Sequence, residues 1–109
     1  MTRKKTDKGD GVDLLDREKE KKKVKPPPKY KVVFHNDDYT PMDFVVVAII
    51  SIFNKSPIDA YRIMMAVHQK GRGIAGGPYS KEIAETKATK AMAFARANGH
   101  PLKATFEKE

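Results

Sequence analysis

A chain of 109 residues with a formal net charge of +8 has room for one domain and a tail. It contains no cysteine, which excludes a disulfide framework, a thiolate metal site and a nucleophilic thiol. Its longest apolar run, residues 44–50, is far shorter than the ~20 residues of a membrane span, and its start lacks the apolar stretch of a secretory signal, so we expect a soluble cytoplasmic protein.

Residues 1–25 are predicted to be a disordered, lysine-rich extension. Residues 1–29 hold 11 Lys and Arg against 6 Asp and Glu, a net charge of +5, and few large apolar side chains. Such a composition cannot bury enough surface to offset the entropy of ordering. The prolines of residues 26–29 favour an extended polyproline II junction that holds the extension clear of the domain. The folded domain is expected at residues 30–109.

The first predicted strand, residues 30–34, leads into a cluster of oxygen-bearing side chains. Its β-propensity is high, and Asn36, Asp37 and Asp38 follow it after His35. Carboxylates held between two rigid elements and bordered by apolar residues suit capture of a small cation. One such cation, which another protein can present, is a free α-amino group.

A helix is predicted over residues 44–53. Its start signal has Thr40 as the cap, Pro41 in the first turn and Asp43 three residues after the cap. The β-branched side chains of this segment favour a strand, but the start signal and the ten-residue length favour a helix. Because it is apolar on nearly all sides, we expect it to be buried at the centre.

A second helix begins at Ser56, where the same start signal recurs, and stops at Gly71. One face carries four side chains at helical spacing, which are Ile58, Tyr61, Met65 and His68. Residues 72–79 follow as an extended segment with a turn at residues 76–78. Residues 71–76 read GRGIAG and match a dinucleotide fingerprint literally, but that motif follows a strand, so we expect a helix cap and no cofactor.

The third helix is predicted to open at Ser80 and to end at Asn98 and Gly99, before a final strand over residues 102–107. The element order is therefore β-α-α-β-α-β. This order indicates an α+β fold in which helices cover one face of a small, mostly antiparallel sheet.

Metal binding and catalysis are poorly supported by the sequence. The histidines His35, His68 and His100 lack the spacing of a metal-binding helix, so no metal site is expected. His35 is expected to face solvent at a strand end, and the pattern alone favours a structural role for His68. Asp37 lacks both a nucleophile and an oxyanion site beside it, so we do not expect an enzyme.

A small basic nucleic-acid- or ribosome-associated protein is the alternative from another class. Lysines of the extension and of the third helix could contact phosphate. Against this reading, no aromatic platform alternates with the basic residues, and the acidic cluster at residues 36–38 repels phosphate.

The chain resembles the ClpS family of Clp protease adaptors across residues 26–109. The resemblance is carried by five motifs, which are YKVV at 30–33, NDDYTPMDFV at 36–45, MAVH at 65–68, AETK at 84–87 and GHPL at 99–102. It implies a three-stranded antiparallel sheet packed on three helices. It also implies an adaptor that recognises proteins with a destabilising first residue (N-degron substrates) and delivers them to the AAA+ unfoldase ClpA, with no need for more than a monomer.

The resemblance further implies roles for single residues. Asn36, Asp37 and His68 match the positions that hold the α-amino group of the substrate. Six positions match the apolar pocket for a first side chain of Leu, Phe, Tyr or Trp, and these are Thr40, Met42, Val45, Met64, Val67 and Leu102. Met42 resembles a gate that disfavours β-branched first residues.

Two positions match the family's unfoldase-facing surface, Glu82 and Lys87. The sequence alone makes them ordinary solvated charges on the polar side of the third helix. The N-terminal extension is implied to be engaged by the unfoldase during delivery.

Overall fold

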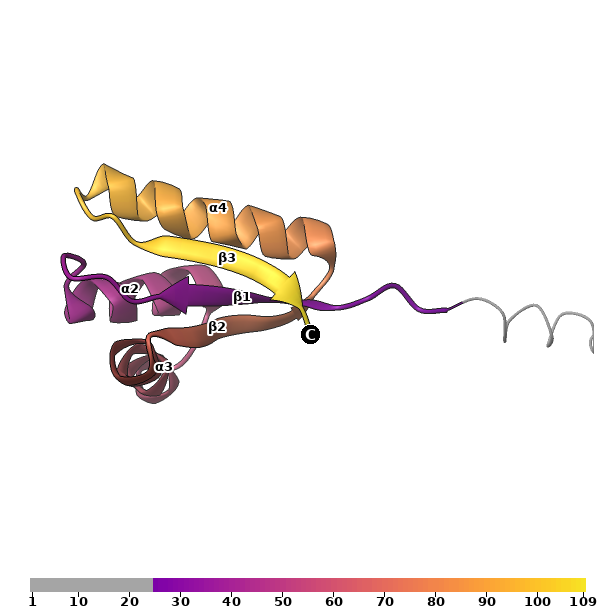
Figure 1. Cartoon of the computed structure of the whole chain (residues 1–109), viewed down its shortest axis with the longest axis horizontal. Coiled ribbons are helices and arrows are strands. Elements are labelled where there is room, and N and C mark those ends of the chain that lie inside the picture. The colour runs from indigo at the N-terminus through magenta and orange to yellow at the C-terminus, as the bar shows by residue number, and fades with distance from the viewer. Residues whose placement is uncertain (1–24) are drawn as a thin grey trace, which may run out of the picture.

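The computed structural model describes residues 25–109 of the chain (Figure 1). The elements follow in the order β1 (Tyr30–His35), α2 (Met42–Phe53), α3 (Pro57–Lys70), β2 (Arg72–Tyr79), α4 (Lys81–Ala97) and β3 (Lys103–Lys108). The predicted order is confirmed. The predicted disorder of residues 1–25 falls almost entirely outside the described residues. Residues 25–29 are exposed, form neither helix nor strand, and lead away from the sheet (Figure 1).

The three strands form one antiparallel sheet in the order β2-β1-β3. Val32 and Phe34 of the central strand are fully buried in the core, where they meet the helices. In Figure 1, α2 passes behind β1, while α4 and α3 lie along the β3 and β2 sides. The expected α+β fold is therefore confirmed. In the part of the chain that the structure describes, no helix is long and apolar enough to cross a membrane.

Helix α2 starts differently from the prediction. Its N-cap residue is Pro41, which makes no side-chain capping bond, and the helix begins at Met42. Thr40 lies one residue before the cap, and its hydroxyl donates to Asp37. The prediction of burial on nearly all sides is also wrong, since Val47 is 50% exposed. A domain of this size has too few layers to surround a helix completely.

Helix α3 begins and ends as predicted. The Ser56 hydroxyl accepts a hydrogen bond from the Asp59 amide at 3.2 Å, and Gly71 closes the helix in the left-handed conformation, with φ of 87°. Of the four residues at helical spacing, Ile58 and Tyr61 are exposed. The buried side consists of Ala60, Met64 and Val67.

Strand β2 runs without interruption to Tyr79, so the predicted turn at residues 76–78 is wrong. The irregularity appears instead as register shifts in the pairing of β1 with β2, on either side of Val32. Gly73 is required for close packing, since a Cβ there would lie 2.8 Å from Cγ2 of Val67. The GRGIAG run therefore supplies a helix cap and close strand–helix contacts.

Helix α4 is capped by Ser80, whose hydroxyl accepts from the Ile83 amide at 3.3 Å, as predicted. Its buried face consists of small side chains, which are Ala84, Ala88, Ala91 and Ala95. Small side chains let the helix backbone approach the sheet closely. The following strand, β3, starts at Lys103, one residue later than predicted.

Candidate functional site

A small pocket, with an enclosed volume of about 10 Å³, lies where the end of β1, the start of α2, the end of α3 and the start of β3 meet. It is lined by ten residues, which are His35, Asn36, Asp37, Thr40, Met42, Val45, Met64, Val67, His68 and Leu102. The structure thus brings together all nine residues predicted for the amine-binding and apolar parts of the site, and it adds His35. What these residues bind remains a prediction.

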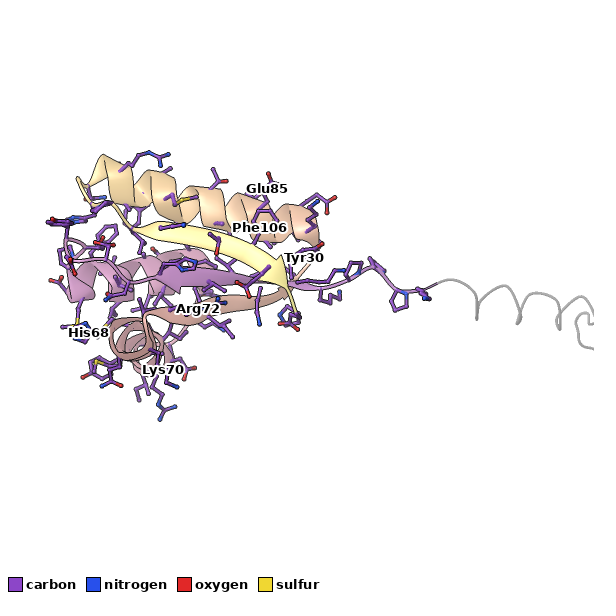
Figure 2. All side chains as sticks on the ribbon, in the orientation of Figure 1. Tyr30, His68, Lys70, Arg72, Glu85 and Phe106 are labelled. Atoms are coloured by element: carbon purple, nitrogen blue, oxygen red, sulfur yellow. The ribbon has the colours of Figure 1, made fainter. Side chains whose placement is uncertain are left out.

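The polar part of the cavity is assembled by a link between the β1–α2 turn and the end of α3. The amide of Asn36 donates a 2.9 Å hydrogen bond to the carbonyl of Gly71, the residue that caps α3. His68 lies on the last turn of α3, at the end of the molecule that carries the β1–α2 turn (Figure 2). Residues more than 30 positions apart in sequence therefore meet at one rim.

Asp37 organises the turn through its side chain. Its Oδ1 accepts hydrogen bonds from the amides of Tyr39 at 2.8 Å and Thr40 at 2.7 Å, and its Oδ2 accepts the Thr40 hydroxyl at 2.8 Å. Burial raises the pKa of Asp37, but the hydrogen bonds from Thr40 and Tyr39, with the nearby His100, outweigh burial and lower this pKa below its usual value. The carboxylate is therefore charged at neutral pH.

The other part of the cavity is apolar. Val45, Met64, Val67 and Leu102 are each at most 6% exposed, so they form a wall that belongs to the core. Met42 is different because it lies on the first turn of α2 with 45% of its surface exposed. The cavity thus joins a polar rim to an apolar interior, with one flexible side chain at its edge.

His35 was missed as a lining residue, and its predicted solvent-facing position is wrong. It is half-buried, and its Nε2 lies 2.8 Å from Oγ1 of Thr105. Burial lowers the pKa of His35, Lys103 and Arg72 lower it further, and Glu107 opposes them. The available signal was its position immediately before Asn36, at the end of the central strand.

Glu82 and Lys87 lie on α4, away from the cavity. Glu82 is exposed, as expected for a solvated charge, and it borders a second groove beside residues 27–30. Lys87 is not an ordinary solvated charge, because its ammonium donates a 2.9 Å hydrogen bond to the carbonyl of Ile52. Within residues 25–109, no cluster of three or more His, Asp or Glu side chains could hold a metal ion.

The sequence profile of the family described as "ATP-dependent Clp protease adaptor protein ClpS" matches residues 25–105. The chain belongs to the ClpS family. A ClpS adapter from Paraburkholderia xenovorans is 46% identical over 102 residues, which cover 94% of both chains. Another from Maricaulis maris is 54% identical over 86 residues, which cover 79% of this chain and 78% of the relative.

The fold is also that of a solved ClpS protein. The structure of Agrobacterium tumefaciens ClpS2 bound to L-phenylalaninamide has a TM-score of 0.73 with this chain, at 39% identity, and the match covers 77% of this chain and 100% of that one. As a ClpS protein, the chain is an adaptor of the ATP-dependent Clp protease. The resemblance read from the five sequence motifs is therefore confirmed.

Proposed function

We propose that this ClpS protein captures protein substrates by their free α-amino group and a bulky hydrophobic first side chain, and delivers them to the ClpA unfoldase. The observation that carries the proposal is the two-part cavity, with polar acceptors at its rim and apolar side chains inside. A first residue of Leu, Phe, Tyr or Trp presents the matching pair of groups. The L-phenylalaninamide bound by the ClpS2 relative has the same two features, a free α-amino group and an aromatic side chain.

The amine is held by three acceptors in this proposal. A protonated amine has three donors, and the Asn36 side-chain oxygen, the Asp37 carboxylate and a neutral His68 nitrogen can each accept one. A free α-amino group titrates at about 7.7–8.0, so a neighbouring carboxylate keeps it charged at neutral pH. Recognition of an N-terminal amine is a recurring mode of peptide binding.

The first side chain occupies the apolar part. The enclosed volume is about 10 Å³ in the peptide-free structure, so the lining side chains move apart to admit it. Met64 in the wall and Met42 at the edge suit several bulky shapes, because thioethers are flexible and contact aromatic rings favourably. Met42 then acts as a gate against first residues that branch at Cβ.

Delivery involves other surfaces. We assign the ClpA contact to Glu82 and Lys87 of α4. We assign the transfer of the substrate to ClpA to the N-terminal extension, residues 1–25, which the junction of residues 26–29 connects to the domain. The junction enters β1 beside the start of α4, so residues 27–29 lie close to Glu82 (Figure 1). The adaptor works as a monomer in the cytoplasm in this proposal.

Fluorescence anisotropy with a labelled Phe-initiated peptide tests the capture step. The matched controls are its N-acetylated twin, which lacks the charged amine, and its Gly-initiated twin, which lacks the side chain. We expect binding of the first peptide alone. Undiminished affinity for the acetylated peptide would show that the amine is not recognised, and equal binding of all three would exclude the cavity as a first-residue site.

A further inference from the structure

The Asp37 carboxylate has little hydrogen-bonding capacity left for a ligand. Its two oxygens offer about four lone-pair sites when ionised. Two sites on Oδ1 are used by the amides of Tyr39 and Thr40, and one on Oδ2 is used by the Thr40 hydroxyl. One site remains, on Oδ2, the oxygen that Thr40 holds.

The Thr40 hydroxyl therefore fixes the orientation of the Asp37 carboxylate, including the oxygen that has a free site. With the bond at 2.8 Å, rotation of the carboxylate would break either this bond or the two amide bonds at Oδ1. All three bonds fix the plane of the carboxylate, and only the hydroxyl bond acts on the oxygen that still has a free site. Thr40 is half-buried in the cavity lining, where water competes less for this bond.

We propose that Thr40 is a positioning residue of the amine site, whose hydroxyl orients Oδ2 of Asp37 so that its remaining lone pair meets the substrate's α-amino group. This inference rests on the proposed capture of a free α-amino group. It gives Thr40 a second role beyond that of an apolar lining residue.

The hydroxyl also lowers the pKa of Asp37. A donor to the carboxylate favours the charged form, and the Thr40 hydroxyl is the largest of the influences that lower the pKa of Asp37 against its burial. The other titratable groups around Asp37 are His100 before β3, His35 of β1 and His68 of α3, with Asp38 next in sequence. These groups are the same in every variant of Thr40, so they do not confound a comparison among variants.

Two variants separate the hydroxyl from the bulk of Thr40. Thr40→Val removes the donor with nearly the same shape, and Thr40→Ser keeps the donor while losing the methyl group. The carboxyl carbon of Asp37 is titrated by NMR in the peptide-free protein, and the affinity for a Phe-initiated peptide is measured at pH 7. We expect Thr40→Val to raise the midpoint of Asp37 and to weaken binding about tenfold, the loss expected for one charge-assisted hydrogen bond, while Thr40→Ser stays near the wild type in both.

The two readouts keep the possible failures apart. An unchanged Asp37 midpoint in Thr40→Val would overturn the inference, and so would a raised midpoint with unchanged affinity. If the wild type binds no Phe-initiated peptide, the proposed function fails, and the positioning role of Thr40 fails with it. The NMR titration still shows in that case whether the hydroxyl acts on the Asp37 carboxylate. Thr40→Ala replaces Thr40→Val if the valine variant does not fold, with the same result expected.

Discussion

The ammonium of Lys87 on α4 donates a hydrogen bond to the carbonyl oxygen of Ile52 in the last turn of α2, at 2.9 Å. The last carbonyls of a helix have no partner within the helix, so this bond satisfies one of them. The same ammonium lies 5.7 Å from the ring centre of Phe53 and 5.6 Å from that of Tyr79. Lys87, which we propose contacts the unfoldase, therefore also joins two helices of this domain.

Replacing Lys87 by Met should destabilise the domain. The half-buried bond to Ile52 is lost and the carbonyl is left without its partner, so we expect the free energy of unfolding to fall by about 1–2 kcal/mol. Glu82→Gln, at an exposed position of the same helix, should change it by less than about 0.5 kcal/mol. Urea denaturation measures both. Equal stability of the two variants would show that the bond contributes nothing, and a delivery defect of Lys87→Met would then report on the unfoldase contact alone.

Two replacements of Asp37 should separate its role in the turn from its charge. Asp37→Ala removes all three hydrogen bonds and should lower the free energy of unfolding by about 1–2 kcal/mol. Asp37→Asn can keep an oxygen for the two amide bonds and should cost less than half as much. Both should lose binding of a Phe-initiated peptide at least about tenfold, since neither carries the charge. Full binding by Asp37→Asn would contradict a charged acceptor.

The contribution of Asp37 to stability should depend on pH. Its pKa in the folded protein is lowered, so the folded state favours the ionised form. The resulting stabilisation is fully present above the unfolded pKa of about 3.9 and is lost as pH falls through the lower folded value. The stability difference between wild type and Asp37→Asn should thus be constant from pH 7 to about 5 and shrink below pH 4. Urea midpoints at matched ionic strength measure it, and a difference that grows on acidification would reverse the assignment.

Much of the fold follows from local signals in the sequence. The start of α3 at Ser56 and of α4 at Ser80, and the end of α3 at Gly71, depend on capping chemistry that neighbouring residues specify, and they were predicted correctly. The start of α2 was not, because its cap is Pro41, one residue after Thr40, whose hydroxyl donates to Asp37. The strand through residues 76–78 was read as a turn because its glycines serve close packing, which depends on distant residues.

The candidate site shows the same division. Each predicted lining residue except Met64, which directly precedes the MAVH motif, stood in a motif that resembles the family, and the fold brings these residues to one cavity. His35 was missed because its partner Thr105 is 70 positions away in sequence. The bond between Lys87 and Ile52 was missed for the same reason, since a surface pattern of charges does not reveal which of them reaches a neighbouring helix.

His68→Ala should remove binding without loss of stability. His68 is exposed at the end of α3, and its side chain makes no hydrogen bond to another residue within the described part of the chain, so its loss should change the free energy of unfolding by less than about 0.5 kcal/mol. Binding of a Phe-initiated peptide should weaken at least about tenfold. Lys70→Ala, at an exposed position two residues further, is the matched control and should bind normally. If the melting temperature of His68→Ala falls in step with its affinity, the histidine has a structural role instead.

The two methionines of the cavity should behave differently, because one is buried and the other is not. Met64 is 6% exposed in the core, so Met64→Ala should lower the free energy of unfolding by about 2–5 kcal/mol and weaken binding of every peptide. Met42 is 45% exposed at the edge of the cavity, so Met42→Ala should cost less than about 1 kcal/mol. Its effect should fall on selectivity: removing the side chain widens the entrance, and peptides that begin with Ile or Val should gain affinity relative to a Leu-initiated peptide. Anisotropy titrations with the three peptides measure the ratio. If the affinity for Ile- and Val-initiated peptides relative to the Leu-initiated peptide is the same in Met42→Ala as in the wild type, the buried wall rejects β-branched residues instead. This affinity ratio should then change in Met64→Ala, provided that this variant folds.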